Sequence, residues 1–152
     1  MILIAAGTGL APFRAFLEER AEQAGRGEAT ASNLLFIGCR HPAHDQLYPA
    51  DLEQWRRQRV AIIHPAYSAL AGFPHRHVQD ALWAARDLVW QTLQAGAPVY
   101  VCGDGAQMAP AVRDCLIHIA GTCGDMPREQ ASQWLQILMQ EGRYHQDIFG
   151  SH

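Results

Sequence analysis

Short apolar runs alternate with longer amphipathic segments along most of this chain. The short runs are too brief and too uniformly apolar for surface helices, which is typical of strands buried on both faces. Strands are expected at residues 2–5, 33–38, 60–64, 99–102 and 145–149. Between them, apolar residues at helical spacing predict helices at 11–24, 49–58, 78–95, 107–119 and 128–141.

Strands that alternate with helices in this way indicate right-handed crossovers and a parallel sheet covered by helices on both faces. The predicted fold class is α/β, a Rossmann-like doubly wound sheet of about five strands. Ligands of such sheets bind beyond the carboxyl ends of the strands. The residues at those ends are Gly7, Thr8, Gly9, Cys39, Arg40, Ser68, Cys102, Gly103 and Asp104.

The composition narrows the function classes. With 152 residues, 49% of them hydrophobic, the chain can close one core, and a single domain over 1–152 is expected. A net charge of −3 and the lack of like-charge runs argue against nucleic-acid binding. No stretch of apolar residues is long enough to span a membrane, and no basic flank of a signal peptide precedes the first strand. A soluble, cytoplasmic protein is expected.

The residue types and their spacing argue against lysine-dependent catalysis, metal binding and a serine nucleophile. All 12 basic residues are arginine, which excludes Schiff-base lysines, phosphate-loop lysines and lysine general bases. The four cysteines lack the spacing of a zinc site and are expected to be free thiols. The histidines near 41–44 and 75–77 have no carboxylate or thiolate at ligand spacing, so no metal is expected. Ser68 lacks the G-x-S-x-G elbow of a hydrolase.

Glycines occupy the turn between the first strand and the first helix, within AGTGLAP at 6–12. Glycines at such a turn let backbone amides and the helix N-terminus face a phosphate. Pro12 stands where a complete G-x-G-x-x-G motif has its third glycine. The segment predicts a pyrophosphate cradle, with an ordinary tight turn as the alternative. Thr8 would donate its hydroxyl to the phosphate or cap the helix.

The end of the fourth strand repeats this arrangement in CGDG at 102–105, and Met108 enters the following helix. A cysteine at the end of a buried strand is usually a small apolar core residue. Cys102 is therefore either structural or functional. Asp104 either faces a ligand or caps the helix that follows.

Several short motifs follow one another over essentially the whole chain. They are GTGLAPFR (7–14), FIGCRHP (36–42), HDQLY (44–48), AYS (66–68), VQ (78–79), YVCGD (100–104) and GRY (142–144). In this order they resemble the NAD(P)H-binding domain of the diflavin reductases. That family includes cytochrome reductase, the sulfite reductase flavoprotein, the reductase region of nitric oxide synthase and the self-sufficient fatty-acid monooxygenases. The last group is the most similar, through CGDGAQMAPAV at 102–112.

The resemblance implies a ferredoxin-reductase-like nucleotide domain in which NADPH delivers hydride to FAD. NADH is the alternative donor. FAD would be held mainly by a β-barrel domain that is absent from this chain, and FMN by a further domain. The partners would be these two domains and a haem monooxygenase or another electron acceptor.

The resemblance also implies roles for individual residues. Cys102 would lie beside the nicotinamide and Asp147 near it, as the catalytic pair that positions the hydride donor. Asp147 could otherwise be an exposed charge near the C-terminus. Phe149 would reach the flavin ring. The remaining ligands would be Gly7, Thr8 and Gly9 at the pyrophosphate, Ser68 at the 2′-phosphate, Gln79 at the adenosine, and Cys39, Arg40, His75, Arg76, His77, Gly103, Asp104 and Met108.

This chain departs from the family pattern at positions that would hold the 2′-phosphate, here called the phosphate clamp, and at the position that would contact the flavin ring. Ala69 stands where an arginine is usual, and His75 and His77 stand where a lysine and a tyrosine are usual. Phe149 replaces the usual tryptophan. Because fewer side chains of the clamp can bind the phosphate, a reduced preference for NADPH over NADH is predicted. His75, Arg76 and His77 could form a substitute clamp.

Two other functions compete with electron transfer. A degenerate nucleotide domain would sense NAD(P)H without catalysis, but the presence of Cys102 and Asp147 favours the enzyme. A dehydrogenase that acts directly on a small substrate would need a substrate domain, for which this chain has no room.

Overall fold

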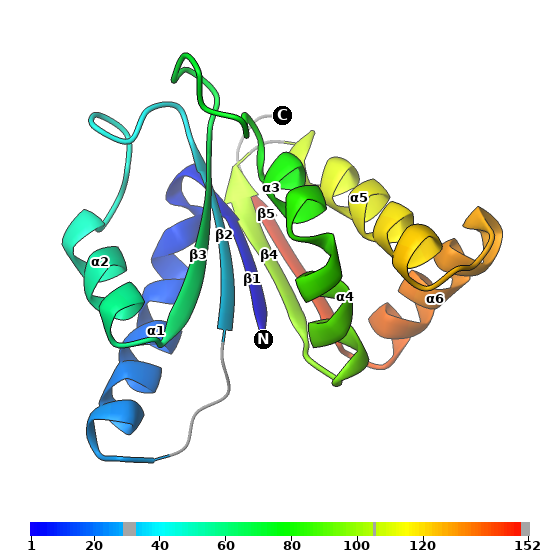
Figure 1. Cartoon of the computed structure of the whole chain (residues 1–152), viewed down its shortest axis with the longest axis horizontal. Coiled ribbons are helices and arrows are strands. Elements are labelled where there is room, and N and C mark those ends of the chain that lie inside the picture. The colour runs from blue at the N-terminus through cyan, green and yellow to red at the C-terminus, as the bar shows by residue number, and fades with distance from the viewer. Residues whose placement is uncertain (29–32, 105, 150–152) are drawn as a thin grey trace.

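The structure is a computed structural model that describes residues 1–28, 33–104 and 106–149, with Asp104 and Phe149 described for their backbone alone. Within these ranges, five strands form one parallel sheet in the order β3-β2-β1-β4-β5 (Figure 1). The strands are β1 (Ile2–Ala6), β2 (Asn33–Cys39), β3 (Ala61–Tyr67), β4 (Val99–Asp104) and β5 (Tyr144–Phe149).

Helices cover both faces of the sheet (Figure 1). They are α1 (Leu10–Gly25), α2 (Pro49–Arg57), α3 (Val78–Ala84), α4 (Arg86–Gln94), α5 (Met108–Cys123) and α6 (Arg128–Gln140). One core joins α1 and α2 to the sheet, and a second core joins α3, α4, α5 and α6 to its other face. The prediction of an α/β, doubly wound parallel sheet is confirmed.

The central strand shows why the apolar runs lack alternation. Ile2 and Ile4 of β1 belong to the core on the α3 side, and Leu3 and Ala5 belong to the core on the α1 side. All four are at most 1% exposed. Because successive side chains of a strand point to opposite faces, a strand covered by helices on both sides must be apolar at every position.

Several predicted elements differ from the structure; the helix expected at 107–119, for example, is α5, which continues to Cys123. The helix expected at 78–95 is two helices that meet at Ala85, whose φ of −99° and ψ of 21° depart from helical values. Arg86 donates from Nη1 to the carbonyl oxygen of Trp83 at 3.1 Å. The spacing of apolar residues does not predict a side-chain hydrogen bond of this kind. The third strand, expected at 60–64, continues through Pro65 to Tyr67. A proline is tolerated there because β3 is an edge strand.

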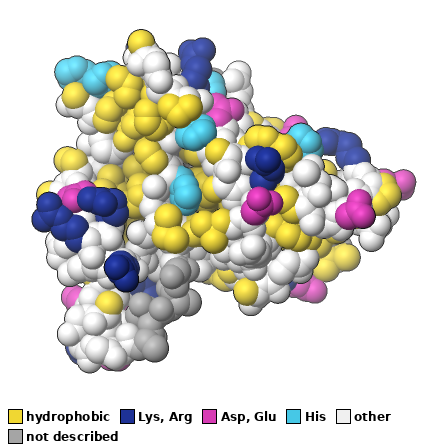
Figure 2. Space-filling model, viewed as in Figure 1, with side chains coloured by type: hydrophobic (Ala, Val, Ile, Leu, Met, Phe, Trp, Pro, Cys, Tyr) yellow, Lys and Arg dark blue, Asp and Glu magenta, His cyan; other side chains and the backbone are white. Residues whose placement is uncertain are grey.

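The exposed edge of the sheet carries apolar side chains. Figure 2 shows hydrophobic residues gathered over β3, with histidines among them. Ile62 on this strand is 45% exposed. His64 lies further along β3, with its ring stacked on Phe36 at a centroid distance of 4.6 Å. Burial, and secondarily the charge of His75, lowers the pKa of His64 below its usual value of 6.5.

Stability is expected to fall as the pH drops below about 6.5, in part through His64. Between the lowered native pKa and the value of the unfolded chain, the unfolded state binds more protons, so protonation favours unfolding. His64→Gln should flatten this slope in urea unfolding measured across the acid range. His44→Gln, which changes an exposed histidine, is the matched control. Equal slopes for His64→Gln and the wild type would contradict the prediction.

Candidate functional site

A cavity of about 740 Å³ opens at the carboxyl end of the sheet. It lies where the chain turns from β1 towards β2 on one side and β4 lies on the other, which is the switch point at which doubly wound sheets bind ligands. The predicted site residues that line it are Gly7, Thr8, Cys39, Arg40, Ser68, Arg76, His77, Gln79 and Met108. The structure therefore brings together residues from four segments of the chain.

The glycine turn forms one wall of this cavity. It is a single 3₁₀ turn, η1 (Gly7–Gly9), directly before α1. Gly7 has a φ of +57°, in the left-handed region that favours glycine. A Cβ on Gly9 would overlap the carbonyl oxygen of Cys102 and stand 2.7 Å from Cα of Gly103. The turn therefore packs directly on the backbone of β4, which only glycine allows.

The helix α1 begins just beyond Gly7 and Thr8, which line the cavity. Its N-cap is Gly9, and no side chain makes a capping hydrogen bond there. Thr8 does not cap the helix; it is exposed on the cavity wall. The first amides of a helix have no partner within the helix and attract anions. Gly7 and Thr8 thus stand in the cavity wall where the pyrophosphate cradle is predicted, and that role stays a prediction.

Gly9→Ala is expected to destabilise the fold by about 1–3 kcal/mol, because the added methyl group forces η1 away from β4. Gly25→Ala is the matched control, since a Cβ on this helical glycine has no neighbour within 4 Å. That change should be neutral or stabilise by up to about 1 kcal/mol. Urea unfolding measures both. Wild-type stability of Gly9→Ala would show that η1 does not need its close contact with β4.

The loops after β2 and β3 form the opposite wall. The amide of Ser68 donates to the carbonyl of Cys39 at 3.0 Å, and the amide of Ala69 donates to that of Arg40 at 2.8 Å. These bonds continue the parallel pairing beyond the strands and bring Ser68 next to Arg40. Burial, with a smaller effect of the Asp45 charge, raises the pKa of the Cys39 thiol. Cys39 is therefore a protonated thiol near neutral pH.

Cys102 and Asp147 are neighbours in the sheet, paired in register between β4 and β5. Cys102 is 3% exposed and belongs to the core on the α1 side, whereas Asp147 is exposed. Burial, and then the charge of Asp147, raises the pKa of the Cys102 thiol. At neutral pH the pair is a neutral thiol beside a carboxylate. A thiolate nucleophile is disfavoured at this position.

Gly103 allows α5 to approach the end of β4. A Cβ at this position would stand 2.6 Å from Cε of Met108 and 3.3 Å from the amide nitrogen of Ala6. Gly103 itself does not line the cavity. Because it has no side chain, Met108 can pack close to it and line the cavity. Asp104 pairs with Phe149 through the backbone. The expectations for the side chains of Asp104 and Phe149 lie outside what the structure describes.

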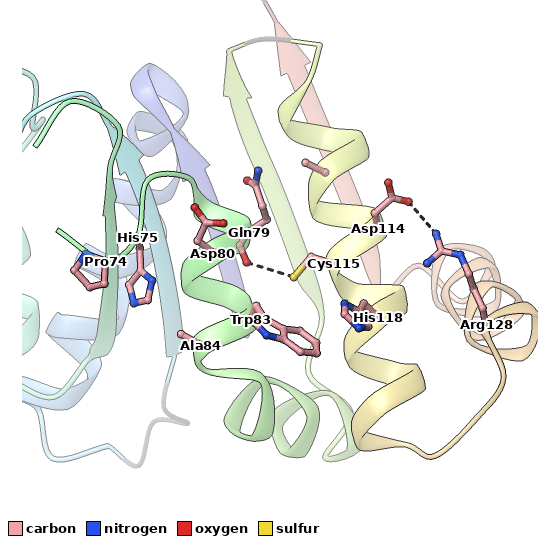
Figure 3. Close-up of a pocket in the computed structure, with 11 residues that line it drawn as sticks. Pro74, His75, Gln79, Asp80, Trp83, Ala84, Asp114, Cys115, His118 and Arg128 are labelled. Atoms are coloured by element: carbon pink, nitrogen blue, oxygen red, sulfur yellow. Dashed lines mark hydrogen bonds and ion pairs between the residues drawn. The ribbon is translucent and has the colours of Figure 1, made fainter. Parts of the chain in front are cut away.

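His75 lies in a neighbouring cavity of about 710 Å³ between α3 and α5 (Figure 3). The two cavities share Gln79 and Ala111 in their walls. Cys115 donates from Sγ to the carbonyl of Gln79 at 3.4 Å, and burial raises its pKa to about 11. Cys115 therefore supports the backbone at Gln79 as a neutral thiol. The predicted clamp of three residues is divided, with Arg76 and His77 in one cavity and His75 in the other.

Some residues of the main cavity were not singled out from the sequence. They are Ala6, Gly38, Asp45, Leu47, Val78, Gln107 and Ala111. Each lies within or directly beside one of the ordered motifs, so the signal was present but was not resolved to single residues. Within 1–28, 33–104 and 106–149, no group of three His, Cys, Asp or Glu residues could hold a metal ion.

Comparison with known proteins agrees with this geometry. The sequence model of the oxidoreductase NAD-binding domain matches residues 3–114. The chain belongs to this family. Over 98% of its length it is 38% identical to the bifunctional cytochrome P450/NADPH–P450 reductase of Bacillus cereus. It is 33% identical to the NADPH–cytochrome P450 reductase of Drosophila melanogaster and 34% identical to the sulfite reductase [NADPH] flavoprotein alpha-component of Neisseria meningitidis, again over 98% of its length.

The resemblance to the diflavin reductases is thus confirmed. This NAD-binding domain spans 14%, 22% and 24% of the length of those three relatives, respectively. Their names specify NADPH as the electron donor. No helix in the described part of the chain is both long and apolar enough to cross a bilayer.

Proposed function

We propose that this chain is a single NAD(P)H-binding domain that holds NADPH in the switch-point cavity and presents its nicotinamide to a flavin on a neighbouring domain. The convergence of Gly7, Ser68, Gln79 and Met108 on one cavity carries the proposal, because these residues come from separate parts of the sequence. The cavity volume of about 740 Å³ lies within the usual range for ligand pockets. When bound, NADPH supplies the hydride that reduces the flavin.

Each wall has a distinct part in binding. The backbone of η1 at Gly7 and Thr8 would face the pyrophosphate, and the guanidinium groups of Arg40 and Arg76 give the opposite wall a positive charge. Gln79 faces the adenosine side between the two cavities. Hydride loss makes a nicotinamide cationic, so the exposed carboxylate of Asp147 favours the charge that develops. Cys102, which is 3% exposed and does not itself line the cavity, would lie beside the ring as a neutral thiol and would not act as a base.

An open face of the sheet adjoins this pair and supports docking of a flavin-binding domain. Tyr100 on β4 stacks on His145 of β5, with centroids 4.8 Å apart and ring planes at 14°. Phe16 of α1 lies 5.9 Å from Tyr100 and is 43% exposed. His145 and Asp147 are exposed as well. Aromatic residues of this kind are enriched at interfaces.

We extend the proposal to the rest of the electron path. FAD would be held by the neighbouring domain and FMN by a further domain of the same reductase. A haem monooxygenase of the cytochrome P450 type or another acceptor would receive the electrons, as the names of the relatives suggest. A cytoplasmic location and the absence of membrane contact remain predictions.

The isolated chain is expected to bind NADPH and to purify without flavin. The cavity residues suit the dinucleotide, whereas the face of β4 and β5 offers a flavin the stacked rings of Tyr100 and His145 and the exposed carboxylate of Asp147. Visible absorbance of the purified protein and calorimetric titration with NADPH test the two parts separately. A yellow preparation with one flavin per chain would contradict the proposed division between domains, and failure to bind NADPH would contradict the nucleotide site.

A further inference from the structure

The strand that carries Asp147 lies at an edge of the sheet. In the part of the chain that the structure describes, β5 pairs with β4 alone, whereas the central strand β1 pairs with both β2 and β4. An edge strand is held by one ladder of backbone hydrogen bonds and leaves its other side unpaired. The position of the Asp147 carboxylate therefore depends on what else holds β5.

Side chains of β5 alternate between the two faces of the sheet. Tyr144 and Ile148 pack into the core on the α5 side, and Gln146 stands between them on the same face. His145 and Asp147 point to the opposite face, on the α1 side. Gln146 is exposed and is the polar member of an otherwise apolar row. A contact with its side chain holds the backbone directly before Asp147 from the other face of the sheet.

A guanidinium group of α5 makes this contact. Arg113 donates from Nη1 to Oε1 of Gln146 at 3.0 Å, between residues 33 positions apart in the chain. Its charge also reaches Tyr144, two residues earlier on the same face of β5. Burial raises the pKa of the Tyr144 hydroxyl to about 12, and the charge of Arg113 opposes this rise. Arg113 therefore lies along the face of β5 that is opposite to Asp147.

The helix that carries Arg113 also forms part of the nucleotide cavity. Met108 and Ala111 of α5 line the cavity, and Arg113 follows Ala111 by two positions. Val112, between them, is fully buried and fixes the helix in the core. Arg113 itself does not line the cavity. It therefore joins the helix that forms one wall of the cavity to the strand that carries Asp147.

The acceptor in this bond is an amide and not a carboxylate. Within the described residues, no carboxylate lies within 4.0 Å of the guanidinium nitrogens of Arg113. Gln146 thus holds the strand without adding a second negative charge next to Asp147. An exposed polar contact contributes little to the stability of a whole fold. Loss of the bond should therefore act locally, on the position of β5.

We infer that Arg113 is a positioning residue for hydride transfer, which holds β5 through Gln146 so that the Asp147 carboxylate stays beside the nicotinamide. The inference rests on the proposed function and adds to it the residue that fixes one of the groups at the reaction site. Arg113 acts through Asp147 and touches neither the nucleotide nor the flavin. A displacement of about 1 Å caused far from the reacting atoms can slow an enzyme by about 100-fold, so a weak contact can have a measurable effect on the rate.

Hydrogen exchange on the isolated chain tests the anchor without any cofactor. Arg113→Leu and Gln146→Leu each remove one partner of the bond, and each should speed amide exchange at 144–148 by about 3- to 10-fold. Exchange in β1 should not change. Arg128→Leu, which removes an exposed arginine of α6 that pairs with Asp114 at 3.6 Å, is the matched control and should leave β5 unaltered. Wild-type exchange of β5 in both leucine variants would overturn the inference.

The effect on the reaction is measured in a chimera, in which this chain replaces the 38% identical domain of the Bacillus cereus P450 reductase. Arg113→Leu should slow flavin reduction at saturating NADPH by about 3- to 10-fold and leave the Kd of NADPH unchanged. Arg113→Lys, which keeps a charged donor, should recover at least part of the rate. In the Asp147→Asn background, Arg113→Leu should have no further effect, because the group that it positions is already lost.

The outcomes separate the inference from the proposed function. Equal slowing by Arg113→Leu with and without the Asp147 carboxylate would show that Arg113 does not act through Asp147 and would overturn the inference alone. Weaker NADPH binding with an unchanged rate at saturation would do the same. A wild-type chimera that binds NADPH and never reduces its flavin would instead contradict the proposed function, whatever the exchange of β5 shows.

Discussion

Asp147→Asn is expected to slow hydride transfer to flavin by about 10- to 1000-fold, which corresponds to a loss of about 1.4–4 kcal/mol of transition-state stabilisation. The carboxylate is exposed beside Cys102 at the end of the sheet, where it can favour positive charge on the nicotinamide. The asparagine side chain has the same shape and no charge. Because Asp147 is exposed, the change should leave the stability of the fold nearly unaltered.

Cys102→Ala is expected to slow the same step on the same scale, through loss of the contact that positions the nicotinamide. Cys102 is also a core residue at 3% exposure, so part of any effect could arise from packing. Urea unfolding of the variant separates the two contributions. Cys115→Ala changes a cysteine that supports Gln79 from α5, and it should not slow the chemical step.

A chimera allows the measurement. The chain replaces the 38% identical domain of the Bacillus cereus P450 reductase, and stopped-flow absorbance follows flavin reduction by NADPH. Asp114→Asn, which changes an exposed carboxylate paired with Arg128 at 3.6 Å, is the control for Asp147→Asn. Unchanged flavin reduction in both Cys102→Ala and Asp147→Asn would show that the assigned roles are wrong. A chimera that binds NADPH but never reduces its flavin would instead favour a sensing domain.

Ala69→Arg is expected to strengthen NADPH binding by about 10- to 150-fold and to leave NADH binding unchanged. Ala69 is exposed next to Ser68, and its amide is held by the carbonyl of Arg40 at 2.8 Å. A longer side chain can therefore extend into solvent beside the cavity without displacing a neighbour. NADH lacks the phosphate that the new guanidinium would bind.

The same substitution should restore NADPH preference to Arg76→Ala, because either guanidinium can serve one phosphate. Ala71→Arg, at an exposed position of the same loop, controls for added charge and should restore little. Titration of NADPH and NADH gives the preference directly. The five proteins are the wild type, Ala69→Arg, Arg76→Ala, and Arg76→Ala combined with either Ala69→Arg or Ala71→Arg. A strong preference in the wild type that neither Arg76→Ala nor Ala69→Arg alters would contradict both the weakened clamp and its replacement by Arg76.

Many, but not all, of the residues that the ordered motifs singled out line one cavity. Gly7, Ser68 and Gln79 were expected in one site because they follow strands or begin a helix of a parallel sheet, and the structure places them together. His75 was expected with them because it stands where the family pattern has a lysine. It lines the neighbouring cavity instead, on the side of α3 away from α5, since the chain enters the helix at His77 and neighbouring side chains diverge (Figure 3).

The sequence by itself determined the five strands, the α/β class and the edge of the sheet at which the cavity opens. These features depend on local apolar patterns and on the rule that parallel strands end at the same edge. Only the tertiary structure decided that Gly9 packs on the backbone of Cys102, that Cys102 is buried beside an exposed Asp147, and that Arg76 meets Ser68. Such contacts join residues distant in sequence through packing and loop closure, which leave no periodic signal in the chain.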